Sequence, residues 1–194
     1  MNSSEHITGI ILAGGKSKRM GHDKALLPFK GKPFLQHIID ALKPLVNDII
    51  IVSDRTEYDQ FGERRVDDLV KNAGPLAGLY SGLYHTETEN NIVVSCDVPL
   101  LKPSLLQRLI TENETEYDAV QFQIEDKTMP LIAMYKKRCM HSCYHLLESG
   151  ERRLRVFVIG LNTHTIVLDE VTAIQATNVN TKKDLKQLKS EFDN

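Results

Sequence analysis

The feature that most constrains the fold of this chain is the alternation of short apolar runs with longer segments of helical spacing. Ile7–Leu12 is apolar and β-branched and leads into two glycines, which is typical of a buried strand that ends in a loop. Similar runs lie at residues 48–53 and 91–99, and apolar residues recur at helical spacing from Phe34 onward. This order predicts a mainly parallel sheet with helices on both faces, because each connection must cross over the sheet.

The later segments continue the pattern. A glycine-rich turn that opens a helix is expected at residues 74–85, helices at residues 103–110 and 181–194, and strands at residues 119–124 and 131–135. Residues 1–194 contain no internal repeat, low-complexity segment or linker, and 194 residues with 41% hydrophobic content suffice for one compact core. The sequence therefore predicts a single three-layer α/β domain. Ligands of such domains bind at the carboxyl ends of the strands.

Charge and hydropathy exclude several classes of protein. The chain has 24 Lys and Arg against 26 Asp and Glu, so a sequence-independent grip on nucleic acid is not expected. No run approaches the roughly 20 apolar residues of a membrane span, and the first residues do not have the pattern of a signal peptide. We expect a soluble cytoplasmic protein that binds neither nucleic acid nor membrane. An anionic ligand must then be held by a local cluster of cations.

The cysteines suggest a metal site that geometry argues against. Cys96, Cys139 and Cys143 form an odd count, which fits a reducing compartment. On a helix the last two cysteines share one face, whereas His141 and His145 lie about 200° around the axis. Four ligands cannot converge from opposite faces, so we predict buried thiols and exposed histidines. A zinc or redox protein is the alternative, which metal analysis would test.

A glycine-rich loop with four cations follows the first strand. Its sequence, LAGGKSKRMGHDKALL at residues 12–27, contains neither GxxxxGK[ST] nor GxGxxG. Gly14 and Gly15 would let the backbone approach a ligand and direct amide hydrogens toward it. Arg19 and Lys24 would supply charge to phosphate oxygens. A surface turn with solvated cations is the alternative, but the position directly after a buried strand favours phosphate binding.

The same run resembles the signature of the molybdenum cofactor guanylyltransferase family. The family pattern LAGGxSxRMGxDK matches residues 12–24. Further matches are GKPFLQH at residues 31–37, GPLAGL at 74–79, CDVPLL at 96–101, GERRLRVFV at 150–158 and NVNTKKDL at 178–185. The resemblance spans nearly the whole chain. It implies a Rossmann-like nucleotidyltransferase fold, with nucleotide-binding residues in the N-terminal half and acceptor-binding residues in the C-terminal half.

The resemblance also implies a reaction. GMP would pass from GTP to the molybdenum–molybdopterin cofactor with release of pyrophosphate, and Mg²⁺ is the expected cofactor. GTP and molybdopterin would be the small-molecule substrates, with transient contacts to the proteins that deliver and receive the cofactor. Two enzyme alternatives are a CTP-dependent sister enzyme and a nucleotidyltransferase with another phosphorylated acceptor. A carrier that binds GTP and cofactor without transferring anything is the alternative from another class.

The family roles map onto individual residues of this chain. Those implied for catalysis are Arg19, Lys24 and Asp97. Those implied for nucleotide binding are Leu12, Ala13, Gly14, Gly15, Lys24, Asp67, Gly78 and Asp97. Asp97 follows an apolar run, where a carboxylate could ligate Mg²⁺ that also bridges phosphates. A turn or helix-capping aspartate is the alternative at this position.

The acceptor site is implied to contain Arg153, Asn178 and Asn180. Arg153 lies in a charged cluster of the kind that usually forms a solvated face. The two asparagines alternate along the chain and would point to one side of an extended segment, or else form a turn before a helix. The chain departs from its relatives after the second strand, where Ser53 and Asp54 replace a family asparagine. We therefore assign no contact there.

Overall fold

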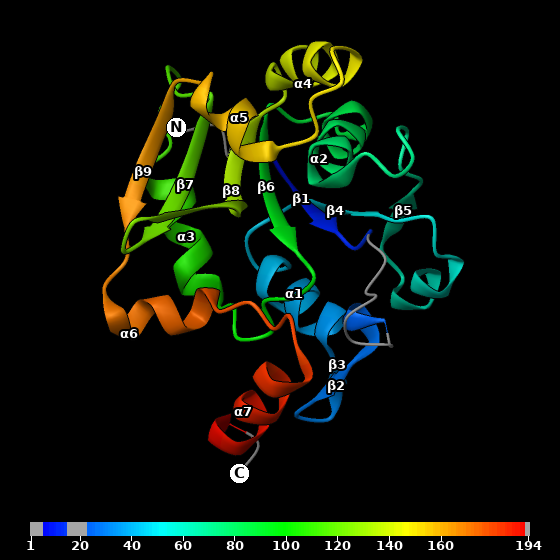
Figure 1. Cartoon of the computed structure of the whole chain (residues 1–194), viewed down its shortest axis with the longest axis vertical. Coiled ribbons are helices and arrows are strands. Elements are labelled where there is room, and N and C mark those ends of the chain that lie inside the picture. Colours follow the sequence, from blue (N-terminus) through cyan, green and yellow to red (C-terminus); the bar gives the residue numbers. More distant parts are fainter. Residues whose placement is uncertain (1–5, 15–22, 193–194) are drawn as a thin grey trace.

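The computed structural model describes residues 6–14 and 23–192. Over these residues a central sheet has the strand order β5-β4-β1-β6-β8-β7-β9 (Figure 1). Its strands are β1 (Ile7–Leu12), β4 (Asp48–Val52), β5 (Arg64–Val66), β6 (Asn90–Ser95), β7 (Ala119–Ile124), β8 (Lys127–Lys136) and β9 (Thr163–Val167). Neighbouring strands are parallel except at β8, which runs antiparallel to β6 and β7. The predicted mainly parallel sheet is confirmed, although the short strands β5 and β9 were not predicted.

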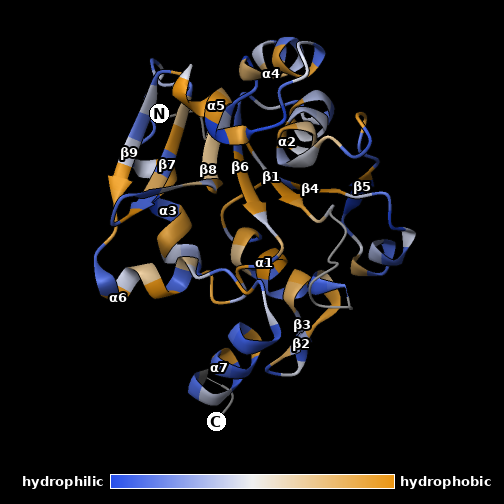
Figure 2. Cartoon of the chain, viewed as in Figure 1, coloured by the Kyte–Doolittle hydropathy of each residue, from blue (hydrophilic) through white to orange (hydrophobic). Residues whose placement is uncertain are grey.

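Helices cover both faces of this sheet (Figure 1). One face packs against α1 (Phe34–Leu42) and α3 (Pro103–Thr111), and the other against α2 (Gly74–His85), α4 (Cys139–Glu148) and α5 (Leu154–Ile159). Side chains alternate between the faces, so Ile11 joins the first core and Ile10 joins the second. The strands at the centre are accordingly mainly hydrophobic (Figure 2), with polar residues at the ends of β6, whose sequence is NNIVVS. The three-layer α/β prediction is confirmed.

Helix α2 lies unusually close to β1 because two of its residues lack side chains. A Cβ added to Gly82 would lie 2.4 Å from Cγ2 of Ile10, and one added to Gly78 would lie 3.4 Å from Cδ2 of Leu12. The first distance is a clash, and the second is ordinary contact. Close packing of α2 therefore requires glycine at position 82 and only favours a small residue at position 78.

The C-terminal segment returns to the N-terminal part of the chain. The hairpin of β2 (Pro28–Phe29) and β3 (Lys32–Pro33) packs against α7 (Lys182–Phe192), and Phe29, Val179 and Leu188 are buried together between them (Figure 1). A short helix, α6 (Glu170–Ala173), precedes this segment. Helix α7 is capped reciprocally, because Thr181 Oγ1 accepts from the Asp184 amide while Asp184 Oδ2 accepts from the Thr181 amide. This docking brings residues near position 180 beside the first strand's loop.

The cysteine-containing helix is structural. Cys139 and Cys143 are buried in α4, whereas His141 and His145 are exposed, as predicted. Burial raises the pKa of the Cys139 thiol to about 12, so it stays protonated at neutral pH. Among residues 6–14 and 23–192, no group of three or more His, Cys, Asp or Glu side chains could hold a metal ion. In the same part of the chain, no helix is long and apolar enough to cross a membrane.

Candidate nucleotide site

The carboxyl ends of four parallel strands are aligned at one edge of the sheet. Leu12 of β1 is paired with Val52 of β4 and with Ser95 of β6, and Val52 is paired with Val66 of β5. The residues that follow these strands therefore meet at that edge. They are Ala13, Gly14, Ser53, Asp54, Asp67, Asp68, Cys96 and Asp97. Four separate pieces of sequence thus contribute to one surface, as the parallel topology predicts.

Three of the predicted residues make direct contact at this edge. Lys24 Nζ donates a hydrogen bond to Asn180 Oδ1 at 2.6 Å and lies 3.5 Å from Asp97 Oδ2. The other oxygen of Asp97 accepts a hydrogen bond from the Ser95 hydroxyl at 2.7 Å. The Lys24 and Asp97 side chains are only 18% and 15% exposed, so their charges interact in a partly desolvated site. A cation, a carboxylate and an amide from three distant segments are thereby held together.

Asp97 is the predicted metal ligand, and its surroundings fit a magnesium ion that arrives with a phosphate. Mg²⁺ usually takes one or two carboxylates and completes its shell with waters and substrate phosphates. Asp97 offers one carboxylate at this edge, and the Ser95 hydroxyl fixes it by a hydrogen bond. The backbone is fixed as well, because the Asp97 carbonyl accepts a hydrogen bond from the Val179 amide at 2.8 Å. The carboxylate is thus pre-oriented for a ligand. The assignment of Mg²⁺ itself stays a prediction.

A second cluster adjoins the first and was not assigned from the sequence. Both carboxylate oxygens of Asp23 accept from the Tyr58 hydroxyl, at 2.8 and 2.7 Å, and Oδ2 lies 3.2 Å from Nη1 of Arg55. Asp23 Oδ1 also accepts from the Ala25 amide at 3.1 Å. Burial, and then the hydrogen bond to Asp23, raises the pKa of Tyr58 well above its usual value. Asp23 belongs to the matched signature, but nothing in the sequence indicates Tyr58.

The described start of the glycine loop is fixed on one side and open on the other. The Ala13 amide donates to the Val52 carbonyl at 3.1 Å, and the Ser53 hydroxyl donates to the Ala13 carbonyl at 3.4 Å. Gly14 is exposed, and among residues 6–14 and 23–192 a Cβ there would meet only the Val52 carbonyl oxygen, at 4.0 Å. None of these residues therefore crowds Gly14.

Two predicted residues of this loop, Gly15 and Arg19, lie outside the described residues. Their assigned roles in nucleotide binding and catalysis stay predictions. The nucleotide-binding roles assigned to Leu12 and Gly78 also stay predictions. In the structure the Leu12 side chain packs against α2 in the core, and Gly78 lies within α2 facing Leu12.

Asp67 and Arg153 are engaged with other partners. Arg65 pairs with Asp67 at 2.5 Å and donates to the Ser53 carbonyl at 2.9 Å. Asp67 follows β5 and Asp97 follows β6, so two strands, β4 and β1, lie between them. Arg153 pairs with Glu151 at 2.7 Å, and its hydrogen bonds hold the pKa of Glu151 at about 2. The Arg153 side chain is 76% exposed, so this ion pair lies at the surface.

A cavity of about 490 Å³ lies beside this edge. It is lined by Pro75, Pro130, Leu131, Arg153, Leu154, Arg155 and Val156. Because β8 is antiparallel and Ile132 pairs with Val94, its residues 130–131 reach the same edge as the end of β6. The cavity therefore combines an apolar lining with the guanidinium groups of Arg153 and Arg155, and it lies at the edge of the sheet that also carries Lys24, Asp97 and Asn180.

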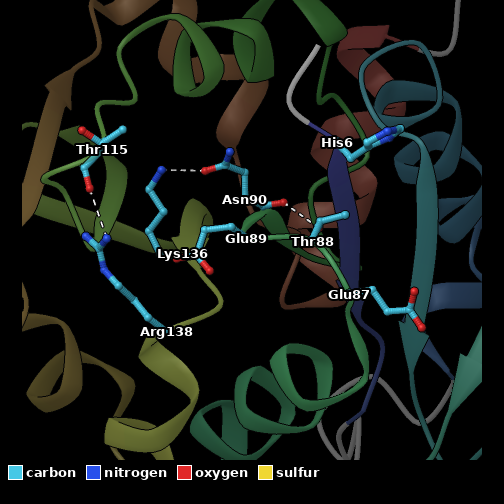
Figure 3. A pocket seen from close by; sticks show the side chains of 8 residues that line it. All are labelled: His6, Glu87, Thr88, Glu89, Asn90, Thr115, Lys136 and Arg138. Carbon is cyan, nitrogen blue, oxygen red and sulfur yellow. Dashed lines mark hydrogen bonds between the residues drawn. The ribbon is translucent and has the colours of Figure 1, made fainter. Parts of the chain in front are cut away.

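A larger cavity, of about 600 Å³, opens at the opposite edge (Figure 3). Both of its Lys and Arg side chains contact the fold: buried Lys136 donates to Asn90 Oδ1 at 2.6 Å, and Arg138 donates to the Thr115 carbonyl at 3.1 Å (Figure 3). None of the described residues predicted for the site lines this cavity. Its position at the amino ends of the parallel strands also departs from the usual location of ligands in such sheets.

Comparisons with known proteins find relatives of this chain. The model of the MobA-like NTP transferase domain matches residues 9–164. A protein of Flavobacterium johnsoniae named probable molybdenum cofactor guanylyltransferase is 36% identical over 184 residues, covering 95% of this chain and 97% of the relative. A molybdenum cofactor guanylyltransferase of Yersinia pestis strain Pestoides F is 33% identical over 183 residues, covering 92% and 93%.

The fold likewise matches a solved structure. The molybdopterin-guanine dinucleotide biosynthesis protein A of Archaeoglobus fulgidus superposes with a TM-score of 0.81, covering 94% of this chain and 97% of that one. At 24% sequence identity, that likeness supports the Rossmann-like nucleotidyltransferase fold alone.

Proposed function

The chain belongs to the family of MobA-like NTP transferases and is a nucleotidyltransferase, and we propose that it transfers GMP from GTP to the molybdenum–molybdopterin cofactor. An oxygen of the acceptor's terminal phosphate attacks the α-phosphorus of GTP. The bond from that phosphorus to the α,β-bridging oxygen breaks, and pyrophosphate leaves with the electron pair. The product is the guanine dinucleotide form of the cofactor. The names of the two relatives, each matched over more than nine-tenths of its length, support GTP and this acceptor.

The observation that carries the proposal is the contact of Lys24 with Asp97 and Asn180. Transfer of a nucleotidyl group needs alignment and charge neutralisation more than a covalent intermediate. Lys24 places a point charge on a flexible stem at the site where negative charge builds up on departing pyrophosphate. Its partial burial strengthens that interaction relative to one in bulk water.

Magnesium would bind through Asp97. When bound with the triphosphate, it neutralises phosphate charge and stabilises the leaving group. The Ser95 hydroxyl orients the carboxylate for this role. Lys24 would then exchange its contact with Asp97 for one with a phosphate.

The acceptor would bind on the C-terminal side of the same edge. Asn180 already touches Lys24, and half-buried Asn178 precedes it by two residues, so both lie near the reacting phosphates. The 490 Å³ cavity offers apolar surface for a flat heterocycle and Arg153 for an anionic group. Transient contacts with delivering and receiving proteins, and a cytoplasmic location, belong to this proposal as predictions.

Pyrophosphate release tests the proposed function. The purified protein is assayed with the molybdenum–molybdopterin cofactor and with GTP or CTP, each with and without Mg²⁺. We expect Mg²⁺-dependent release with GTP and little with CTP. Turnover with CTP alone would identify the sister enzyme. GTP binding without pyrophosphate release in the parent protein would instead support a carrier.

A further inference from the structure

We propose that Tyr58 and Arg55, acting through Asp23, are positioning residues that aim Lys24 at its site. The inference rests on the proposed role of Lys24 and deepens it. Asp23 directly precedes Lys24 and is held from three directions: it accepts hydrogen bonds from the Tyr58 hydroxyl and the Ala25 amide, and it forms an ion pair with Arg55. The orientation of the lysine's backbone is therefore set by how the preceding carboxylate is held.

The local backbone explains how this orientation is transmitted. Asp23 caps a single 3-10 turn, η1 (Lys24–Leu26), through the Ala25 amide. The turn closes with hydrogen bonds from the Leu26 amide to the Asp23 carbonyl and from the Leu27 amide to the Lys24 carbonyl. A turn this short has little rigidity of its own, because two hydrogen bonds hold it. Its direction depends on the cap.

Tyr58 supplies the rigid part of the arrangement. The side chain is fully buried in η2 (Thr56–Phe61) and shares a core cluster with Ala13 and Ala25. Its hydroxyl reaches both Asp23 oxygens, and a fully buried ring cannot turn toward another partner. Arg55 is the N-cap residue of the same 3-10 helix. Its side chain, which is 44% exposed, pairs with Asp23 from the solvent side.

The connection from β4 to β5 also holds the other end of the glycine loop. The Ser53 hydroxyl donates to the Ala13 carbonyl and accepts from the Arg55 amide at 3.2 Å. One segment of nine residues, 53–61, thus contacts the glycine loop at two places. Ser53 contacts Ala13 near the start of the loop, and Tyr58 contacts Asp23 near its end. We infer that this segment sets the distance between the backbone at Ala13 and the ammonium group of Lys24.

The test combines a double-mutant cycle with a measurement that needs no turnover. Tyr58→Phe and Arg55→Gln are each made in the parent and in Lys24→Ala. We expect each single variant to lower kcat for pyrophosphate release, by about tenfold for Tyr58→Phe, since small misplacements of a reacting group cost up to about a hundredfold. In the Lys24→Ala background neither change should lower the residual rate further, because their effect passes through Lys24.

Acylation of individual lysines, followed by mass spectrometry, reports the position of Lys24 directly. Tyr58→Phe should speed acylation of Lys24 severalfold while leaving Lys32, on the neighbouring hairpin, unchanged. Tyr144→Phe is the matched control, since Tyr144 makes the same kind of hydrogen bond, to Glu148 at 2.8 Å, on the outer surface of α4. It should alter neither kcat nor Lys24 acylation.

Three results would overturn the proposal: unchanged kcat in both single variants, equal losses in the parent and Lys24→Ala backgrounds, or unchanged acylation of Lys24. A variant that is merely destabilised would give equal losses in both backgrounds, and Arg55→Gln, at a half-exposed position, guards against a folding defect in Tyr58→Phe. If the parent protein releases no pyrophosphate from GTP, the proposed function fails, whereas the acylation measurement still decides this inference.

Discussion

The two edges of the sheet both contain buried polar groups, but they use them differently. At the amino edge the Thr88 hydroxyl donates to the Thr8 hydroxyl at 2.8 Å, and the side-chain amide of Asn91 donates to the Glu89 carbonyl at 3.1 Å. These hydrogen bonds hold together the chain segments at the amino ends of β1 and β6. At the carboxyl edge Lys24 bonds to Asn180, 156 residues away in sequence, and lies 3.5 Å from Asp97. The larger cavity is at the amino edge, so cavity size is a poorer guide to the site than convergence of distant charged groups.

The largest expected difference between the two edges is in turnover, which a substitution at the carboxyl edge should lower. Lys24→Ala should lower kcat by on the order of 10²–10³, the usual loss when one preorganised electrostatic partner of a transition state is removed. The melting temperature should also fall, because the variant removes a partner of Asp97 and Asn180 in a partly desolvated site, so kcat is compared per folded molecule. Pyrophosphate release and thermal unfolding of the same preparation give both values. A variant with full turnover would remove the distinction between the edges.

Asp97→Asn should give a loss of similar order and also alter the response to magnesium. The amide keeps the shape and can still accept from the Ser95 hydroxyl, but it lacks the charge that binds Mg²⁺. Titrating Mg²⁺ against pyrophosphate release should show a higher requirement in the variant. An unchanged Mg²⁺ curve with reduced kcat would assign Asp97 to holding Lys24 instead of metal.

Lys136→Ala makes the complementary change at the amino edge. It removes the donor 2.6 Å from Asn90 Oδ1 in a buried site, which should lower the free energy of unfolding by about 1–3 kcal/mol. Turnover per folded molecule should equal that of the parent. Denaturant titration and pyrophosphate release measure the two quantities. A fall in kcat without loss of stability would show that the two edges are coupled.

The smallest effect is expected in α2, at the position that faces Leu12 near the carboxyl edge. Gly78→Ala introduces a Cβ at ordinary contact distance from Leu12 and should leave stability within about 1 kcal/mol, because alanine favours the helix. Gly82→Ala is the matched control, since its Cβ would clash with Ile10 and should destabilise by about 1–3 kcal/mol. If Gly78→Ala keeps its stability but raises KM for GTP, the predicted nucleotide role of Gly78 is supported. An unchanged KM would assign Gly78 to packing.

Much of the fold could be predicted because the signal is local. Residues 74–85 are predicted as a glycine-rich turn that opens a helix, and α2 occupies this segment from Gly74 onward, with Pro75 in its first turn. The three-residue strand β5 and the edge strand β9 escaped prediction, because their pairing partners in the sheet, not their own sequences, make them strands. The antiparallel direction of β8 is equally a matter of pairing.

By itself the sequence determined the alternating architecture, the family signature and the residue types needed at a phosphate site, because these depend on short-range patterns of apolar, glycine and charged residues. Only the tertiary structure decided which of those residues meet. It joined Lys24 to Asp97 and Asn180, set Arg153 against Glu151, and placed Tyr58 under Asp23. The physical reason is that such contacts span up to 156 residues of chain and depend on the register of the strands and the docking of α7, which no local pattern encodes.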